Sequence, residues 1–253
     1  MEYTLYQNDK KIYIQDIVRR ITVIVFYFLM MDVLSTYLAM LLLWIFPSID
    51  KLLATVIMQY VIYIPIFIFC ITILKCEINE GINTAKHSPY KRFLATIGIG
   101  IITAYALNIF GGIISNALSS ASNSENEAAI EEMFKSSYGL LIVLLVCIIA
   151  PIVEEIVYRG AMLKGLEKLK IHPTVALIIS SLIFGFIHVL TAGDYAQVFP
   201  YIFMGLVLGY VYQKTKSIVA SICVHMLINT ISTSLQFFLM VLEALKLIPE
   251  GTI

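Results

Sequence analysis

The stretch from 152 to 159 reads IVEEIVYR and places two glutamates and an arginine among aliphatic neighbours. Residues four apart share one face of a helix, so Glu155 and Arg159 can form an ion pair along their own helix. Adjacent residues point about 100° apart, so Glu154 faces elsewhere and receives no cation from its own helix. A buried carboxyl group of this kind can act as a general base toward water near neutral pH. We therefore expect Glu155 and Arg159 to support the structure and Glu154 to carry chemistry.

Two further pairs of residues at spacing four occur in apolar segments downstream. Phe184 precedes His188, and His225 precedes Asn229, so each pair occupies one helix face. A neutral histidine can orient a water or bind a metal, and an asparagine can donate a hydrogen bond to a developing oxyanion. A single intramembrane histidine or asparagine is more often a contact between helices. One carboxylate, two imidazoles and one amide on three helices together favour a site that activates water.

Other hydrolytic patterns are absent from the sequence. It contains no HExxH motif, no pair of aspartates within an apolar run, and no serine in an obvious arrangement with His and Asp.

Membrane helices must position these residues, because the composition is far from that of a soluble domain. Of the 253 residues, 60% are hydrophobic and 13% are charged, and the mean hydropathy is +0.90. A helix needs roughly 20 mostly apolar residues to cross a bilayer. The sequence predicts an all-α bundle with seven spans, at about 18–46, 52–74, 93–117, 138–163, 173–191, 197–213 and 217–242. An eighth span would arise if the stretch 217–248 were broken near Ser232, Thr233 and Ser234.

Lys and Arg residues are distributed unevenly between the connections of these spans. One side carries Lys10, Lys11, Arg19, Arg20, Lys75, Lys86, Lys91, Arg92, Lys164, Lys168, Lys170, Lys214 and Lys216, and the other carries Lys51, Lys135 and Lys246. Because Lys and Arg collect on the cytoplasmic side of short loops, the amino terminus is predicted to be cytoplasmic. The polar, acidic loop 118–137 is then expected to be external, partly helical and mobile. The whole chain, 1–253, is expected to form one membrane domain.

The remaining features predict structure rather than chemistry. Gly205 and Gly209 are four apart, which is typical of close helix packing through small residues. Asp32 lies in an apolar run outside the motifs, and we expect it to make a structural polar contact. No basic cluster is interleaved with aromatic residues, so no nucleic-acid partner is predicted. The first sixteen residues are too polar for a signal peptide and are expected to be retained. Four cysteines without CxxC spacing are expected to be packing residues, namely Cys70, Cys76, Cys147 and Cys223.

The motifs EExxxR, FxxxH and HxxxN, in this order and in separate apolar segments, resemble those of the CPBP family. This family comprises CAAX prenyl endopeptidases and the bacterial intramembrane proteases linked to bacteriocin processing and immunity, also called the Abi family. The resemblance covers about residues 138–235, which we take as a catalytic core.

The resemblance implies an intramembrane endopeptidase of the glutamate type. Glu154 would be the general base that polarises the attacking water, and His188 would help to hold that water. His225 and Asn229 would form the oxyanion hole. Structural support would come from Glu155, Arg159 and Phe184.

Many members of the family are labelled metalloproteases, so the cofactor is an open question. A zinc held by Glu154, His188 and His225 is chemically reasonable. We favour metal-free chemistry with no cofactor, because no two His ligands occur at spacing four on one helix.

The depths of the site residues give one inconsistency. At about 1.5 Å per residue from the cytoplasmic ends, Glu154 and His225 lie at roughly 12 to 15 Å, whereas His188 lies at about 22 Å. We predict that span five either begins before residue 173 or is tilted.

Three functional classes are compatible with these residues. The favoured one is a peptidase in a bacterial plasma membrane, with membrane lipid and a peptide or membrane-protein substrate as partners. The alternative is a non-enzymatic bacteriocin-immunity or signalling protein on the same scaffold. A proton-coupled transporter is disfavoured, because the two halves show no matching segments and span four has no break at the acids beyond Pro151. The sequence leaves the oligomeric state open.

Overall fold

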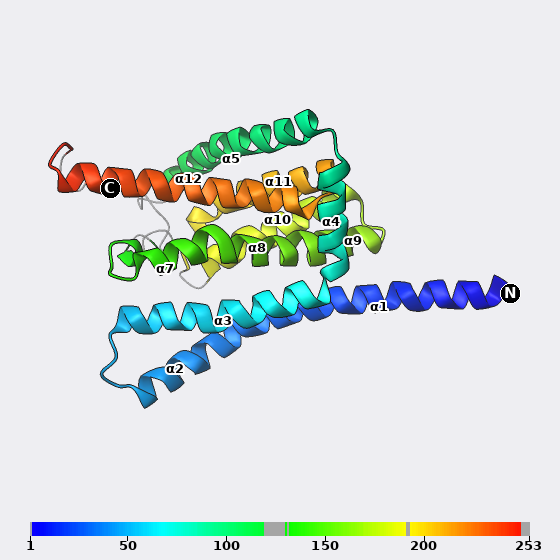
Figure 1. Cartoon of the computed structure of the whole chain (residues 1–253), viewed down its shortest axis with the longest axis horizontal. Coiled ribbons are helices and arrows are strands. Elements are labelled where there is room, and N and C mark those ends of the chain that lie inside the picture. Colours follow the sequence, from blue (N-terminus) through cyan, green and yellow to red (C-terminus); the bar gives the residue numbers. More distant parts are fainter. Residues whose placement is uncertain (1, 119–129, 131, 191–192, 249–253) are drawn as a thin grey trace.

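The protein folds as a bundle of long helices that run side by side (Figure 1). The computed structural model describes residues 2–118, 130, 132–190 and 193–248, and every regular element in this part of the chain is a helix. The side chains of residues 2–9, Asp32 and Ala244 lie outside this description. The predicted all-α class is therefore confirmed.

Within the described residues, seven helical stretches are long and apolar enough to cross a membrane. They are Lys10–Ile45, Lys51–Ile73, Tyr90–Leu118, Gly139–Lys168, Pro173–Leu190, Tyr195–Thr215 and Ile218–Glu243. The seven predicted spans are confirmed, with edges that differ by a few residues, except that the first stretch begins earlier and the fourth ends later. Their outward faces carry many large apolar side chains, such as Trp44 and Leu140, as expected for contact with lipid tails.

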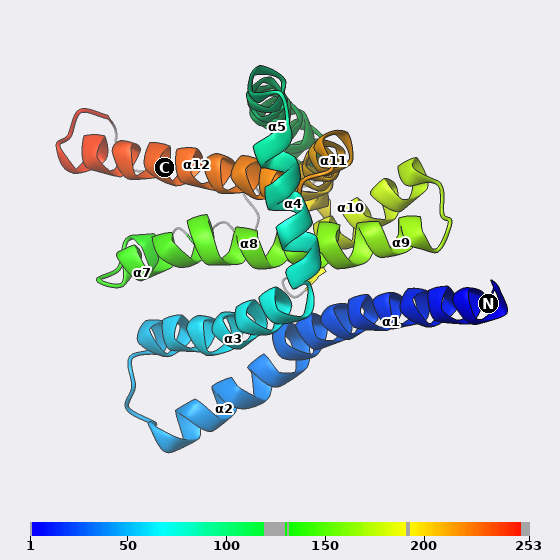
Figure 2. The ribbon, with the colours of Figure 1, turned by 45° about the vertical axis from the view of Figure 1, so that its right-hand side comes forward.

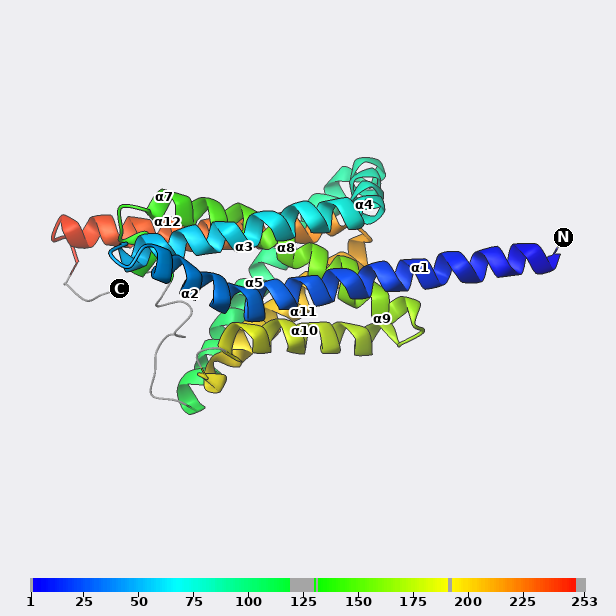
Figure 3. The same ribbon diagram turned by 90° about the horizontal axis from the view of Figure 1, so that it is seen from below.

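The amino-terminal helices form a hairpin beside the rest of the bundle. The first arm consists of α1 (Glu2–Phe28), the π-helical turn η1 (Leu29–Leu34) and α2 (Ser35–Ile45). The chain then returns through α3 (Lys51–Ile73), whose first turn is capped by the Asp50 carboxylate at 2.8 Å from Leu53 N. Figure 3 shows α1 and α2 as one bent arm.

A short helix crosses the ends of the bundle. This helix, α4 (Lys75–His87), packs against α3 and α12 and precedes α5 (Tyr90–Leu118), and Figure 2 shows it crossing the direction of the long helices. Its sequence is rich in lysine and glutamate, and one glutamate, Glu77, is buried. The polar groups of α4 therefore lie across the ends of the long helices and not within the apolar layer.

The fourth span is the central helix of the fold and lies between α3 and α12 (Figures 1 and 2). It is not uniformly α-helical, because two π-helical segments interrupt it. Its parts in order are α7 (Gly139–Leu144), η2 (Leu145–Ile149), α8 (Ala150–Glu155), η3 (Ile156–Leu163) and α9 (Lys164–Lys168). Glu154 and Glu155 are thus the last two residues of α8, the short α-helix between the two π-helical segments.

The carboxyl-terminal helices complete the bundle. They are α10 (Pro173–Leu190), η4 (Tyr195–Gln197), α11 (Val198–Thr215) and α12 (Ile218–Ala244). Because α12 is continuous through Ser232, Thr233 and Ser234, the eight-span alternative is wrong. The proposed earlier start of span five is also wrong, since α10 begins at Pro173.

Small residues allow α10 and α11 to approach closely. A Cβ atom on Gly205 would lie 3.0 Å from Ser181 Cα, and one on Gly209 would lie 2.3 Å from Leu177 Cδ1. The packing role predicted for these two glycines is confirmed. Gly185 adds a contact that the sequence analysis missed, since a Cβ there would lie 2.9 Å from the backbone nitrogen of Ile202.

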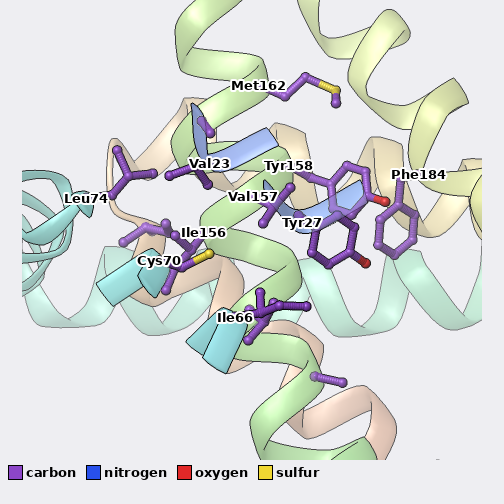
Figure 4. Close-up of a cluster of buried hydrophobic side chains, with 14 of the residues drawn as sticks. Val23, Tyr27, Ile66, Cys70, Leu74, Ile156, Val157, Tyr158, Met162 and Phe184 are labelled. Carbon is purple, nitrogen blue, oxygen red and sulfur yellow. The ribbon is translucent and has the colours of Figure 1, made fainter. Parts of the chain in front are cut away.

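The apolar core surrounds the central helix. Figure 4 shows side chains from α1, α3 and α10 packed around η3, among them Tyr27, Ile66 and Phe184. Tyr158 of η3 is fully buried, and its ring meets Tyr27 and Phe184 edge to face, with centroids 5.9 Å and 5.1 Å apart. The π-helical segment is thus fixed by packing on several sides.

Several sequence expectations fall partly outside the described residues. Most of the loop 118–137 is not described, although Glu132–Phe134 is helical and Phe134 is buried. The backbone of Asp32 lies in η1, but its side chain is not described, so its expected polar contact stays a prediction. Cys70 and Cys147 are buried, and Cys76 is exposed, which corrects its expected packing role.

Candidate active site

Glu155 is fully buried and holds three polar neighbours. Its Oε1 lies 2.9 Å from Arg159 Nη1 and 3.0 Å from His225 Nδ1, and its Oε2 accepts a hydrogen bond from Ser221 Oγ. The predicted Glu155–Arg159 pair is therefore confirmed. The contacts from α12 were not predicted, and they join the central helix to the helix that carries the second histidine.

Arg159 is also buried, and it has polar and aromatic contacts besides its ion pair with Glu155. Its Nη2 donates to the carbonyl oxygen of Gly205 at 3.0 Å, and its guanidinium carbon lies 4.9 Å from the centre of the Phe184 ring. Because Gly205 has no side chain, its carbonyl can approach this close to the arginine. A cation over an aromatic face in a desolvated site is worth roughly 2 kcal/mol. The Phe184 ring thus supports the arginine, as well as lying beside His188.

Glu154 is buried and turns to a different side of the helix from Glu155. Its Oε2 lies 3.8 Å from Nε2 of His225. This separation is too long for a direct hydrogen bond and is of the kind in which a bridging water should be considered. His225 therefore contacts Glu155 through Nδ1 and faces Glu154 through Nε2.

The two histidines share one tautomer preference. His188 Nδ1 lies 2.7 Å from the Phe184 carbonyl oxygen, which can only accept a hydrogen bond, so Nδ1 carries the proton. The same argument places a proton on His225 Nδ1, because the Glu155 carboxylate is an acceptor. In the neutral rings, both Nε2 atoms are then lone-pair acceptors for a water molecule.

Phe184 lies between the two imidazoles. Its ring centre is 4.7 Å from that of His188 and 6.1 Å from that of His225. The other face of His188 stacks on Tyr201 of α11, at 4.6 Å and an interplanar angle of 17°. Phe184, which was predicted to lie beside His188, thus connects this histidine to His225.

Asn229 contacts the central helix at its upstream π-helical segment. Its Nδ2 donates to the carbonyl oxygen of Val146 at 2.9 Å. In an α-helix this oxygen would accept from the amide of Ala150, but that amide bonds to Leu145 O, one residue further back. The π turn thus leaves the Val146 carbonyl to Asn229, and the second N–H of the amide remains for another acceptor.

The donor chemistry of the site suits zinc, but the placement does not. Both Nε2 atoms are lone-pair donors, and the opposite ring nitrogens meet a carbonyl and a carboxylate, as is usual for zinc-bound histidines. Among the described residues, however, no three His, Cys, Asp or Glu side chains lie together in a way that could hold a metal ion. As placed, Glu154, His188 and His225 do not form a metal site.

The sequence analysis missed Ser221 and the interrupted helix. Ser221 was detectable, because it precedes His225 by four residues and Asn229 by eight, and so lies on the same face of α12. The π-helical segments had no comparable signal in the sequence. A pocket lies between α2 and α3, lined by residues such as Ser35 and Gln59, away from the motif residues.

Fold and site together define a multi-pass membrane protein with buried or half-buried glutamate, histidine and asparagine side chains on three of its helices. Residues 136–231 match the family described as type II CAAX prenyl endopeptidase Rce1-like. The match includes every motif residue from Glu154 to Asn229, confirms the predicted resemblance and supports a membrane protease role.

Two curated proteins are similar to the chain. "Putative membrane peptidase YdiL" of Bacillus subtilis (strain 168) is 29% identical over 175 residues, which is 69% of each chain. An "Uncharacterized protein" of Mycoplasma capricolum subsp. capricolum is 29% identical over 150 residues, which cover 53% of this chain and 43% of that protein. No solved structure matches the chain.

Proposed function

We propose that this chain is an intramembrane endopeptidase that cleaves a membrane-associated peptide or protein by attack of a glutamate-activated water. The observation that carries the proposal is the position of Glu154, a buried carboxylate 3.8 Å from His225 Nε2 and separate from the Glu155–Arg159 pair. A carboxylate without an arginine of its own is free to accept a proton. The family match and the printed name of the Bacillus relative support the same reading.

In the proposed reaction, Glu154 takes a proton from the water while the water oxygen attacks the carbonyl carbon of the scissile bond. His188 helps to hold this water through its Nε2. The negative charge on the tetrahedral intermediate is stabilised by Asn229, through its second N–H, and by His225 when its ring carries both protons. The intermediate then releases the amine, which receives the proton from Glu154, and the C–N bond is broken.

The supporting residues hold this arrangement in a fixed geometry. Glu155 fixes the ring orientation of His225, Ser221 and Arg159 fix Glu155, and Gly205 and Phe184 hold Arg159. Glu155 contacts His225 directly, and the other groups act on His225 through Glu155 or Arg159. This division explains why adjacent glutamates can have different roles.

The substrate class that we propose is a peptide or protein held at the membrane, in a bacterial plasma membrane. The matching family is described as prenyl endopeptidases, so a prenylated CAAX peptide belongs among the probes. Peptide precursors and membrane proteins without a prenyl group are the other class, and we favour them.

The test is a cleavage assay with purified protein in lipid nanodiscs. The probes are a library of lipid-anchored peptides and, separately, a farnesylated CAAX peptide, with products identified by mass spectrometry. Glu154→Gln should reduce cleavage by roughly 10²–10⁴-fold, as expected for loss of a general base. The matched control is Glu80→Gln. Glu80 is an exposed carboxylate on α4 that pairs with Lys164 of α9.

Two results would contradict the proposal. Cleavage that survives Glu154→Gln in a folded protein would remove the general base. A biological output that survives the same substitution, with no cleavage of any probe, would favour the non-enzymatic immunity or signalling protein.

A further inference from the structure

A buried arginine from the amino-terminal helix contacts the downstream π-helical segment of the central helix. Arg20 is 1% exposed, and its Nη1 donates to the carbonyl oxygen of Gly160, the residue directly after Arg159. Arg20 and Gly160 are 140 positions apart in the chain. Arg20 lies outside residues 136–231 and belongs to none of the three motifs.

The π-helical backbone makes this carbonyl available. In an α-helix, Gly160 O would accept from the amide of Lys164. Here the Lys164 amide bonds to Arg159 O and Ala161 O, on either side of Gly160. The Gly160 carbonyl, which the Lys164 amide does not bond at this turn, accepts from Arg20.

The same pattern occurs at the upstream π-helical segment. There the Ala150 amide bonds to Leu145 O, and the carbonyl of Val146 that it leaves out accepts from Asn229. Each π turn therefore has a side chain from another helix on a carbonyl that has lost its α-helical partner. Glu154 and Glu155 lie between these two contacts.

The Arg20 guanidinium is itself held in one orientation. Its Nε lies 3.0 Å and its Nη2 3.1 Å from the two carboxylate oxygens of Asp16, and Nη2 also donates to Glu77 of α4. Lys168 of α9 closes the network by donating to Asp16. The side-chain carbons of Arg20 lie near Gly165, whose added Cβ would be 3.5 Å from Arg20 Cδ.

We propose that Arg20 is a positioning residue that fixes the π-helical register of η3 and, through it, the placement of Glu154 and Glu155. Its planar fork is suited to this task, because it makes four hydrogen bonds in fixed directions to two carboxylates and a carbonyl, whereas a lysine ammonium has three donors and no fork. The effect on catalysis rests on the proposed function, whereas the effect on register does not. Asn229 is its counterpart at the upstream π turn.

The register can be tested without a substrate, because the sequence contains one Gly–Ala pair, Gly160–Ala161, and one Val–Glu pair, Val153–Glu154. Protein labelled with carbonyl-¹³C glycine and ¹⁵N alanine gives a single N–CO signal, from the Gly160 carbonyl. Carbonyl-¹³C valine with ¹⁵N glutamate gives a single signal at Glu154. Solid-state NMR spectra of the full chain in lipid bilayers report both positions.

The main variant is Arg20→Lys, which keeps a positive charge beside Asp16 and Glu77. The ammonium will pair with the carboxylates and leave the Gly160 carbonyl. We expect an upfield shift of the Gly160 carbonyl carbon and a change in the Val153–Glu154 signal. Arg19→Lys is the matched control, because the Arg19 side chain is 42% exposed and donates to Asp16, whereas Arg20 donates to Gly160 as well; both signals should keep their positions.

Two results would overturn the proposal. An unchanged Gly160 signal in Arg20→Lys would show that the bond does not hold the carbonyl. A shift at Gly160 with an unchanged signal at Val153–Glu154 would show that the arginine stabilises only its own turn. If Arg20→Lys does not fold, a triple variant takes its place. This variant combines Asp16→Asn, Arg20→Met and Glu77→Gln, so it removes the buried charges together. The same two NMR signals are then measured.

Activity provides a separate readout. For a peptide cleaved in the nanodisc assay, Arg20→Lys should lower kcat by roughly 10²-fold, the scale of a misplacement of about 1 Å, with KM unchanged. A rise in KM with unchanged kcat would contradict a positioning role. The absence of any cleaved peptide would count against the proposed peptidase and leave the NMR test of the register standing.

Discussion

His225 Nδ1 lies 3.0 Å from Glu155 Oε1, so the glutamate that neutralises Arg159 also orients the histidine of α12. One buried carboxylate thus joins two helices that are 70 residues apart at these positions. Its neighbour, Glu154, can remain available for chemistry because Glu155 performs both structural tasks.

Removal of one member of the Glu155–Arg159 pair should destabilise the protein strongly. Glu155→Gln leaves the Arg159 cation buried without its counter-ion, at a cost of roughly 3–5 kcal/mol, and Arg159→Met leaves the carboxylate in the same state. The double variant should recover part of this loss, because it removes both charges. Thermal unfolding in detergent micelles, with Glu154→Gln as the adjacent control, measures the cycle. Additive losses in the double variant would show that the two side chains are not coupled.

Gly185 and Gly112 should respond differently to alanine. A Cβ at Gly185 would lie 2.9 Å from the backbone nitrogen of Ile202, so Gly185→Ala must separate α10 from α11. We expect a loss of about 1–3 kcal/mol, the usual cost of overpacking. A Cβ at Gly112 would meet nothing within 4 Å, and Gly112→Ala should leave stability unchanged or raise it by up to about 1 kcal/mol. Equal melting temperatures for the two variants would contradict the close packing.

Cys76 provides a test of orientation. It is exposed on α4, next to the cation-rich ends of the helices, whereas Cys70 and Cys147 are buried. If the amino terminus is cytoplasmic, a maleimide that cannot cross membranes should label Cys76 in inside-out vesicles and not in intact cells. Cys76→Ser removes the signal and serves as the control. Labelling in intact cells would reverse the proposed topology.

Chelation separates the metal-free mechanism from the zinc alternative. We expect cleavage in the nanodisc assay to survive treatment with EDTA or 1,10-phenanthroline, and elemental analysis of the active protein to find less than one zinc per chain. Loss of cleavage that returns with added zinc would require Glu154, His188 and His225 to move together around the ion.

The sequence was sufficient for those features that depend on local spacing. The Glu155–Arg159 pair, the facing of Glu154 away from it and the Gly205 and Gly209 contacts all follow from residues four apart, or adjacent, on one helix. The seven spans follow from apolar length. None of these requires knowledge of which helices are neighbours.

Features that depend on tertiary neighbours were not predictable in this way. Nothing in the spacing shows that Arg20 of the first helix reaches Gly160, or that Asn229 reaches the Val146 carbonyl. Both contacts require the π turns, and the depth count along ideal helices did not include them. It also proposed an earlier start for span five, although α10 begins at Pro173, so the tilt of this helix stays a prediction.

The π-helical segments have a consequence for how the chain can change over generations. A π turn contains one residue more than the α-helical path needs, so an ancestral insertion is a simple origin for each segment. Deletion of one residue within Ile156–Leu163 would restore an ordinary α-helix with its two ends in nearly the same orientation, because the wide turn absorbs the extra residue. The wide turn would be lost, and the Gly160 carbonyl would then accept from an amide of its own helix in place of Arg20. The length of this segment should therefore be constrained by the contact with Arg20, while the lipid-facing ends of the bundle can vary in length.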